Sequence, residues 1–487
     1  MRNVDYPHDY VTPGYMLAAE AIVPIYPFQM DLLDLPDKSV SVNGVFLDAE
    51  NVAHWKSKTE FLKKFVRQKN VLNFVELTGF NVKKSLANTH QLTLEITDAC
   101  NLKCKYCGYG EFYEDHDERN NQYMTPASVK VLLDYLVDLW NSSLNESQGT
   151  VIYISFYGGE PLMNMDLIRY VVSYFEQVEL KHNRVIYSMT TNAVLLKKYI
   201  DYLVDKKIEL LISLDGDKIN NAHRVYQNGQ ESFDLVDQNI KYVLSRYPDY
   251  FYNHVNFNSV LHNLNSVSDI YHYIKTTYGK LPNISELNNT GIKQSRLDDF
   301  EKTYRNAHES LYQAEDYEQI KRDMFVRLGE TMDVSLFLLK YSGNIYHSYN
   351  DFFSYKSAIK RTPTGTCLPF SKKMFVTVTG KILTCERIGH QFGVGQVVDN
   401  AVELDFDTIA ERYNAYYKRV GILCRQCYNL ETCIQCIYNM KNIDSNPKCA
   451  GFENKKIFEG KLNYVMGYLS KNEDFYGNVL DNLLIDF

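Results

Sequence analysis

The chain has 487 residues, which is long enough for about three domains. Its apolar fraction of 45% and its charged fraction of 23% are those of an ordinary folded protein, so wholesale disorder is excluded. The formal net charge of −8 gives no electrostatic reason to expect nucleic acid or an anionic membrane as a partner. No segment offers about 20 uncharged apolar residues, and the first residues lack the apolar run of a signal peptide, so we expect a cytoplasmic protein.

Residues 1–90 carry no recognisable motif. Their apolar opening is interrupted by prolines, and the stretch from Lys56 to Lys69 is a plausible helix. We interpret the segment as an N-terminal cap; a recognition module and a simple structural extension are the alternatives.

Strands and helices alternate from residue 91 to residue 290. Gln91 to Thr97 alternates apolar and polar residues, which is the period of a strand. Further strands, rich in β-branched and aromatic residues, are predicted at 151–156, 184–191, 208–214, 254–261 and 283–287. Thr125 and Pro126 begin a helix with a capping residue followed by proline, and further helices are predicted at 165–179, 195–206 and 233–246. This alternation predicts an α/β fold with a parallel sheet, and six units are too few for a complete eight-fold barrel. We therefore expect a partial, open (β/α)6 barrel similar to a TIM barrel.

The remaining residues divide into three predicted parts. Residues 291–365 have the composition of a charged helical bridge, residues 366–455 hold seven of the ten cysteines, and residues 456–487 form a tail that we expect to be helical. Because a reducing cytosol disfavours disulfides, grouped cysteines there more often hold metal or do redox chemistry. The sequence therefore predicts two metal-binding regions.

The first group of cysteines is Cys100, Cys104 and Cys107, which follow the first predicted strand of the barrel. Three thiolates on a short loop cannot complete a closed tetrahedral site, but they can bind three irons of a 4Fe–4S cluster and leave the fourth iron open. A zinc site with a distant fourth ligand, or three unrelated thiols, are the alternatives.

Polar or glycine-rich segments also end the next three predicted strands. Tyr157 to Pro161 ends the second strand, Thr190 to Asn192 the third, and Ser213 to Gly216 the fourth. Each segment alone is an ordinary strand-to-helix turn. In parallel α/β barrels, however, the chemistry collects at the carboxyl ends of the strands, so we expect these segments and the cysteine loop to share one rim.

The cysteine loop, together with the Gly-Gly-Glu-Pro segment at 158–161, resembles the radical S-adenosylmethionine (radical SAM) enzymes over residues 91–290. The resemblance implies that Cys100, Cys104 and Cys107 bind a 4Fe–4S cluster whose open iron is chelated by the amino and carboxylate groups of S-adenosylmethionine. It also implies a set of cofactor-binding residues: Tyr106, Gly158, Gly159, Glu160, Asn192, Ser213, Asp215 and Arg224.

The roles of these residues follow from the same resemblance. The two glycines and Glu160 face the methionine amino group, since glycine lets backbone carbonyls approach closely. Ser213 and Asp215 offer hydrogen bonds to the ribose or nearby polar atoms, and Arg224 pairs with the carboxylate through its planar guanidinium. The chain departs from the family where Asn220 and Asn221 replace a His-Asp pair, and where Ala193 replaces the glycine that commonly follows the Thr-Asn strand ending.

The second group of cysteines lies in the predicted C-terminal region. Their order resembles the SPASM extension of radical SAM enzymes that modify peptides and proteins, although only two residues separate Cys433 from Cys436, where relatives commonly have three. By that resemblance Cys367, Cys385 and Cys436 hold a first auxiliary 4Fe–4S cluster, which is one thiolate short of a full set. Cys424, Cys427, Cys433 and Cys449 hold a second auxiliary cluster, which makes three clusters in all. Without the barrel, the four-cysteine run fits a zinc knuckle as well.

Glu386 directly follows Cys385. In sulfatase-maturing relatives an acidic residue at the matching position is a candidate general base, and a carboxylate shielded from water could take a proton during bond formation. The alternative is a surface glutamate paired with Arg387.

The sequence therefore predicts a radical SAM enzyme that modifies a ribosomally made precursor peptide by removing a hydrogen atom with a 5′-deoxyadenosyl radical. A cross-link, a thioether and another oxidation all remain open as products. The expected partners are the precursor peptide and an electron donor such as flavodoxin or ferredoxin. The alternatives are an anaerobic sulfatase-maturating enzyme that forms formylglycine, and a zinc-stabilised scaffold protein without catalysis.

Overall fold

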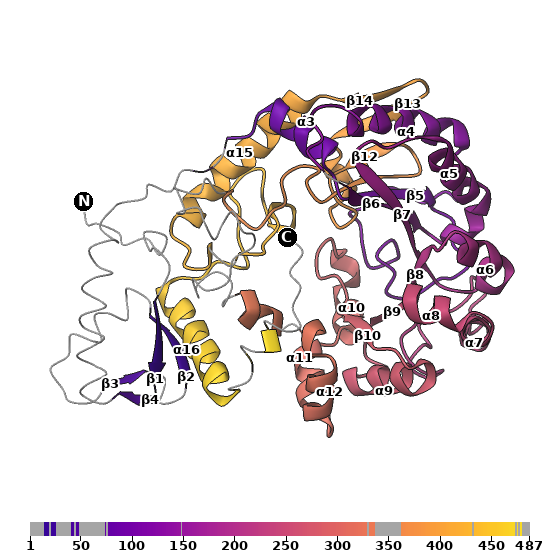
Figure 1. The fold of residues 1–487 in the computed structure, drawn as a ribbon. Helices are drawn as coiled ribbons and strands as arrows, with labels where there is room; N and C mark the ends of the chain where they lie inside the picture. The colour runs from indigo at the N-terminus through magenta and orange to yellow at the C-terminus, as the bar shows by residue number, and fades with distance from the viewer. Residues whose placement is uncertain are drawn as a thin grey trace. The chain divides into compact units, whose positions relative to one another are not determined.

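The computed structural model describes residues 14–18, 21–25, 40–42, 45–47, 74, 76–147, 149–328, 331–336, 362–430, 433–472, 475 and 478–479 (Figure 1). The chain divides into two compact units. One unit contains Leu77–Met324 and Cys367–Arg412, and the other contains Met1–Glu76, Phe325–Thr366 and Tyr413–Phe487. The helix predicted at 56–69 lies outside the described residues.

A ten-stranded sheet forms the first unit, and its strands follow the order β10-β9-β8-β7-β6-β5-β11-β12-β13-β14. The six predicted strands are β5 (Gln91–Thr97), β6 (Thr150–Gly158), β7 (Asn183–Thr191), β8 (Glu209–Ser213), β9 (Val255–Val260) and β10 (Pro282–Ser285). Each of them pairs in parallel with the next. Because the sheet ends at β10 and β14 without closing, the predicted partial α/β barrel is confirmed.

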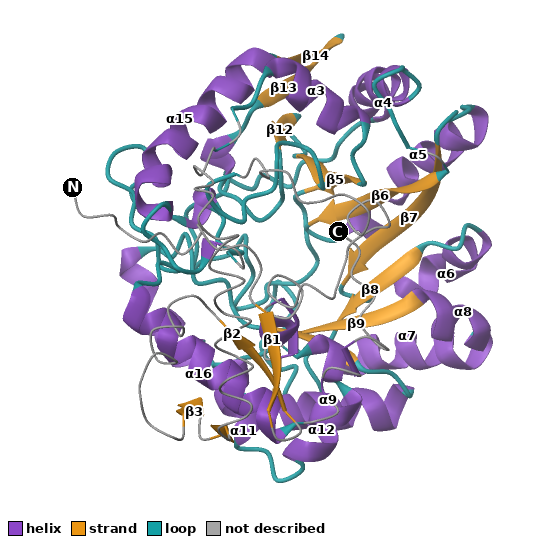
Figure 2. Cartoon of the chain, turned by 60° about the vertical axis from the view of Figure 1, so that its left-hand side comes forward, coloured by secondary structure: helices purple, strands orange, loops and turns teal. Residues whose placement is uncertain are grey.

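Helices follow the parallel strands and cover the outer face of the sheet (Figure 2). They are α4 (Pro126–Trp140), α5 (Met165–Gln177), α6 (Leu196–Asp205), α7 (Phe233–Arg246), α8 (Pro248–His254) and α9 (Val267–Tyr278). The Thr125 side chain accepts a hydrogen bond from the Ser128 backbone N–H, so α4 begins with the predicted cap. The opposite surface of the sheet carries the alternate residues of each strand, such as Thr93, Glu95 and Thr97 of β5, which are also buried.

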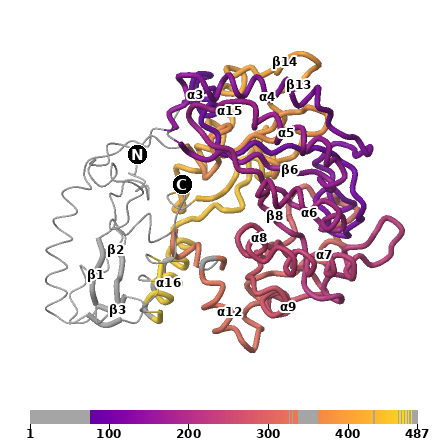
Figure 3. The backbone as a smooth tube through the Cα atoms, turned by 45° about the vertical axis from the view of Figure 1, so that its right-hand side comes forward, coloured from indigo at the N-terminus to yellow at the C-terminus, as the bar shows by residue number. Residues whose placement is uncertain are grey.

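Four short strands from the later part of the chain extend the same sheet, an extension that the sequence analysis does not predict. They are β11 (Lys373–Val376), β12 (Lys381–Leu383), β13 (Gly395–Val398) and β14 (Ala401–Leu404). β11 pairs in parallel with β5, and the other three pair in antiparallel fashion. The hairpin of β13 and β14 lies beside α4, which α3 (Gly79–Ala87) also contacts (Figure 3).

Three short helices follow β10: α10 (Leu297–Thr303), α11 (Ala307–Tyr312) and α12 (Tyr317–Asp323). In the other unit, β1 (Gly14–Ala18) pairs with β2 (Ala21–Ile25), and β3 (Val40–Val42) pairs with β4 (Val45–Leu47). α15 (Phe406–Cys424) begins in the first unit and ends in the second, and α16 (Lys455–Lys471) belongs to the second. Short 3-10 turns lie at Pro161–Asn164, Gln294–Arg296, Phe325–Arg327, His390–Phe392 and Ile437–Asn439. Across the described ranges, every helix is too short or too polar to span a bilayer.

Candidate active site

The first cysteine loop begins three residues after β5 and is held by the loop that follows β8. The backbone N–H of Lys103 donates to the Val225 carbonyl at 2.7 Å, and that of Lys105 donates to the His223 carbonyl at 3.1 Å. These bonds fix the path of the backbone between Cys100 and Cys107, so the thiols are positioned by two strand-end loops of the barrel.

The thiols of Cys100, Cys104 and Cys107 lie close enough to interact electrostatically with one another. Burial raises the pKa of Cys100 to about 11 and that of Cys104 to about 12. Without metal these two thiols therefore carry protons at neutral pH, and metal binding would release those protons.

Gly158 and Gly159 lie directly against the backbone that leads into the cysteine loop. A Cβ at Gly158 would lie 2.1 Å from the Thr97 carbonyl oxygen, and one at Gly159 would lie 2.0 Å from that of Ala99. Gly158 also has a φ of +131°, which side chains rarely adopt. Both positions therefore require glycine because the end of β6 packs against the residues that precede Cys100.

Glu160 is fully buried, and its carboxylate binds the end of β7. Oε1 accepts hydrogen bonds from the Thr191 hydroxyl at 2.7 Å and from the Leu162 N–H at 3.1 Å, and Oε2 accepts one from the Asn192 N–H at 2.8 Å. Burial raises the pKa of Glu160 to about 7, although these three donors favour the charged form. The residue ties the ends of β6 and β7 together beside the cysteine loop.

Asn192 connects that junction to the first cysteine. Its Nδ2 donates to Oδ1 of Asn101 at 2.8 Å and lies 3.7 Å from Sγ of Cys100. The next residue, Ala193, has a φ of +62°. Glycine adopts this left-handed conformation most readily, which explains why the resemblance implies a glycine at this position.

Asp215 and Arg224 contact each other in a buried, bidentate ion pair. Nε of Arg224 donates to Oδ2 of Asp215 at 2.9 Å, and the second guanidinium nitrogen donates to Oδ1 at 3.0 Å. The Tyr106 hydroxyl also donates to Oδ2, and the Val260 N–H donates to Oδ1 at 2.9 Å. Burial raises the pKa of Asp215, but the Arg224 guanidinium and the neighbouring His262 outweigh burial, so the pKa lies below its ordinary value.

Tyr106 connects this ion pair to the cysteine loop. Its ring stacks on His262 with 5.3 Å between the ring centroids, and the Arg224 guanidinium lies 5.4 Å from the tyrosine ring. Asn221 accepts a hydrogen bond from the Asp215 N–H at 3.2 Å, whereas Ser213 is the partly buried last residue of β8. The structure thus brings together Tyr106, Asp215 and Arg224, and the predicted cofactor contacts of these residues stay predictions.

His262 and Arg119 also belong to this site, although no sequence motif marks either residue. His262 is fully buried after β9, and its Nε2 lies 3.6 Å from Oδ2 of Asp215. Arg119 pairs with the buried Glu95 of β5 at 3.2 Å and also donates to the Asp98 carbonyl. Neither the single His262 nor the charged loop around Arg119 forms a sequence motif. The one available signal is Glu95, because a glutamate within a buried barrel strand needs a positively charged or hydrogen-bonding partner.

Cys385 and Glu386 follow β12 in the same unit. Lys373 donates to Oε1 of Glu386 at 2.9 Å, and the glutamate side chain is only 14% exposed, whereas that of Arg387 is 86% exposed. Nε of Arg387 also lies 3.8 Å from Oε1 of Glu386, so the pair with Arg387 is present, but this glutamate is largely buried and also pairs with Lys373. Burial raises the pKa of Glu386, but Lys373 outweighs burial, so the carboxylate is charged at neutral pH.

Four cysteines of the second unit line one small cavity. They are Cys424, Cys427, Cys433 and Cys449, and apolar side chains such as Leu423, Leu430 and Met440 complete the wall. The Cys424 thiol interacts electrostatically with the other three, and burial raises its pKa. Four thiols in one apolar cavity fit the donor set of an iron–sulfur cluster.

The other predicted ligands are distributed between the units: Cys367 and Cys385 belong to the first, and Cys436 belongs to the second. None of the ten cysteines forms a disulfide. Among the described residues, no three His, Cys, Asp or Glu side chains lie close enough together to hold one metal ion. The thiolates of a 4Fe–4S cluster each bind a different iron, so that cluster needs wider spacing than a single zinc ion does.

Comparison with known proteins supports this interpretation. Residues 94–275 match the family model of the Radical SAM superfamily. The radical SAM cyclopropyl synthase TigE of Paramaledivibacter caminithermalis is 24% identical over 52% of this chain and 50% of its own length. The cysteine-type anaerobic sulfatase-maturating enzyme of Clostridium perfringens is 25% identical over 29% of this chain and 37% of its own length. The chain thus spans half or less of the length of these curated relatives.

The solved structure of native anSMEcpe with bound AdoMet is similar to this chain in fold. Its TM-score is 0.53 at 17% sequence identity, and the match covers 81% of this chain and 100% of that chain. The predicted resemblance to radical SAM enzymes is confirmed by the family match, and residues 94–275 form a radical SAM domain.

Proposed function

We propose that this protein is a radical SAM enzyme that modifies a ribosomally synthesised peptide. The observation that carries the proposal is the position of Cys100, Cys104 and Cys107 on one loop at the carboxyl end of the partial barrel, against Gly159 and Asn192. The three thiols would hold a 4Fe–4S cluster that binds S-adenosylmethionine. When bound, this pair supplies a 5′-deoxyadenosyl radical that removes a hydrogen atom from the substrate.

The protein residues position the cofactor and exclude water. The glycine pair lets β6 approach the cysteine loop, and Glu160 holds the end of β7 beside it. The buried pair of Asp215 and Arg224 holds Tyr106, and with it the middle of the loop. Pre-organisation of this kind is the contribution that a protein makes to cofactor chemistry.

The later cysteines would bind two auxiliary 4Fe–4S clusters that accept the electron left on the substrate after bond formation. The shared cavity of Cys424, Cys427, Cys433 and Cys449 supports the second of these clusters. Cys367, Cys385 and Cys436 remain the ligands proposed for the first. A flavodoxin or ferredoxin would supply the reducing electron.

Anaerobic purification followed by metal analysis tests the cluster assignment. We expect iron for about three four-iron clusters per chain, with little zinc. Zinc without iron would instead identify the zinc-stabilised scaffold. Under strong reductant the enzyme should produce 5′-deoxyadenosine from S-adenosylmethionine.

Variants of the cysteine loop test which residues carry the reaction. Cys104→Ala should abolish 5′-deoxyadenosine formation, whereas Lys105→Ala, which changes an exposed side chain of the same loop, should retain it. Full activity of the Cys104 variant would refute the ligand assignment.

An anaerobic sulfatase-maturating enzyme is the second candidate. The buried Glu386 beside Cys385 favours it, because a shielded carboxylate next to a cluster ligand suits a general base. The bound Lys373 makes that carboxylate a weaker base, which favours the first proposal. Incubation with a Cys- or Ser-containing sulfatase peptide distinguishes the two, since only the maturase forms formylglycine.

A further inference from the structure

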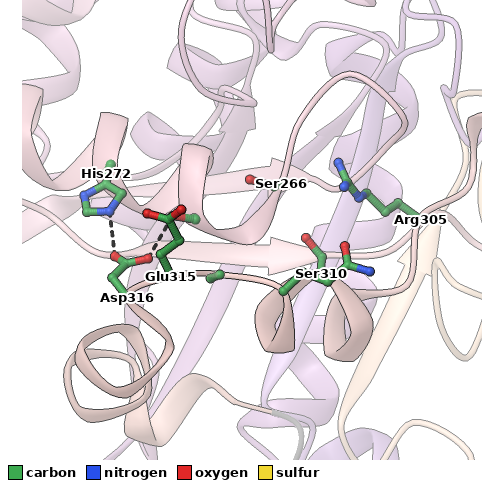
Figure 4. A pocket seen from close by; sticks show the side chains of 9 residues that line it. Ser266, His272, Arg305, Ser310, Glu315 and Asp316 are labelled. Carbon is green, nitrogen blue, oxygen red and sulfur yellow. Dashed lines mark hydrogen bonds and ion pairs between the residues drawn. The ribbon is translucent and has the colours of Figure 1, made fainter.

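A polar cavity of about 440 Å³ lies outside the candidate active site, between the start of α9 and the segment from α11 to α12. Figure 4 shows Ser266, His272, Arg305, Ser310, Glu315 and Asp316 around it. A volume of this size accommodates a ligand of several polar groups. Neither the radical SAM motifs nor the auxiliary cysteines use these residues.

One end of the cavity is acidic. Nε2 of His272 lies 2.6 Å from Oδ2 of Asp316, and the Ser268 hydroxyl donates to Oδ1 of the same carboxylate at 3.0 Å. Glu315 stands next to this pair and is exposed. Although His272 lies against Asp316, none of the ion pairs among the described residues involves Glu315, so the charge of Glu315 remains available to a cation.

The other end carries Arg305. One guanidinium nitrogen donates to the Asn265 carbonyl, which fixes the side chain at the cavity wall. Arg305 and the two acidic residues approach the cavity from different sides (Figure 4), and within the described structure Arg305 forms no ion pair with either of them. Ser310 accepts a hydrogen bond from the Val267 N–H at 3.0 Å, which leaves its hydroxyl proton free to donate into the cavity.

The cavity lies at the same end of the sheet as the cysteine loop, because α9 starts where the chain leaves the carboxyl end of β9. Asn265, whose carbonyl holds Arg305, also donates from Nδ2 to the Asp215 carbonyl at 3.2 Å. The wall of the cavity and the buried ion pair of the active site therefore share one short loop. A substrate that reaches the active-site rim could extend to this cavity.

We infer that this cavity binds a segment of the peptide substrate that presents a carboxylate to Arg305 and a cationic side chain to Glu315 and Asp316. The inference rests on the proposed function as a peptide-modifying enzyme. A purely anionic ligand would be repelled by Glu315, and an apolar ligand would leave Glu315 and the Arg305 guanidinium without a counter-charge. A peptide with both charges satisfies both ends.

Binding of short capped peptides to the anaerobically reconstituted enzyme tests the inference, with saturation-transfer NMR as the readout. The probe is acetyl-Asp-Gly-Lys-amide. Three controls replace Asp by Asn, Lys by Gln, or both. We expect the doubly charged probe to bind about two- to fivefold more tightly than either singly charged control, the range expected for partly exposed ion pairs.

Two variants with matched controls locate the binding. Arg305→Gln and Glu315→Gln should each lower the affinity for the doubly charged probe by a similar factor. Arg322→Gln and Glu318→Gln on the adjacent α12 should leave that affinity unchanged. Equal binding of all four peptides, an affinity for the probe that Arg305→Gln leaves unchanged, or preferential binding of a free amino acid over the capped peptides would each overturn the inference.

Formation of 5′-deoxyadenosine by the same preparation separates this inference from the proposed function. Cofactor cleavage without probe binding refutes only the inference that the cavity binds a peptide segment. Probe binding without iron or cofactor cleavage refutes the proposed chemistry and leaves the cavity assignment standing.

Discussion

Replacement of Asp215 by Asn tests whether the buried ion pair holds the active-site loops together. Asp215 is fully buried and accepts four hydrogen bonds, two of them from Arg224. Asparagine removes the negative charge and replaces one of the two accepting oxygens by an N–H₂ group, which then faces the donors that bind the carboxylate. Because the Arg224 guanidinium is left buried without its counter-charge, we expect a loss of about 3–5 kcal/mol in the free energy of unfolding.

Urea unfolding followed by the fluorescence of Trp140 measures this loss. Trp140 is fully buried in α4, within the unit that holds the sheet, and the only other tryptophan of the sequence is Trp55. In a Trp55→Phe background the signal therefore reports the unfolding of the sheet alone. This matters because chains with more than one compact unit commonly deviate from two-state unfolding.

The control is Glu231→Gln, which removes an exposed ion pair with Lys218 and should cost no more than about 1 kcal/mol. The double variant Asp215→Asn with Arg224→Met should lose less than the sum of its single variants, since it leaves no unpaired charge. A loss for Asp215→Asn that does not exceed the control would refute the reasoning.

Three further predictions concern packing, charge and metal binding. Gly159→Ala places a Cβ 2.0 Å from the Ala99 carbonyl, so we expect a loss of about 1–3 kcal/mol in stability, measured in urea, and less iron retained at the first cysteine site. Burial raises the pKa of Asp237, but Lys241 and two tyrosine hydroxyls outweigh burial and lower it. Its stabilising effect is therefore fully present above pH about 4 and is lost as the pH falls through the lowered pKa, so Asp237→Asn should cost about 1–3 kcal/mol at pH 7 and progressively less as the pH is lowered below about 4 in parallel urea titrations. Cys424→Ala should reduce the iron content by one cluster and preserve 5′-deoxyadenosine formation, as followed by iron analysis and chromatography of the nucleoside.

The barrel could be predicted from sequence because its signals are local. The residues of β5 alternate in character, and Thr125 with Pro126 marks the start of α4 before any tertiary contact is known. The strands β11 to β14 escaped prediction because each has only three or four residues and owes its place to pairing partners far away in the chain.

The sequence predicts which residues belong to the candidate site, but it does not predict which of them contact one another. The cysteine spacing and the glycine pair identify a cofactor site, but spacing cannot show whether Arg224 contacts a ligand or Asp215. That choice depends on the path of the loop between residues 215 and 224, which brings the two charges together over nine positions. Similarly, the resemblance leads us to expect glycine where this chain has Ala193, but only the backbone reveals the left-handed conformation of that residue.

The contacts of the polar residues at the strand ends show how the rim is held together. Glu160 joins the ends of β6 and β7, Asn192 joins β7 to the cysteine loop, and Asp215 joins β8, β9 and Tyr106. Because each of these side chains already binds a protein partner on a neighbouring strand end or loop, the protein's own contacts help to hold the loops in place. We expect the backbone carbonyls next to the glycines to approach the cofactor from this framework, with the surrounding side chains fixing where those carbonyls point.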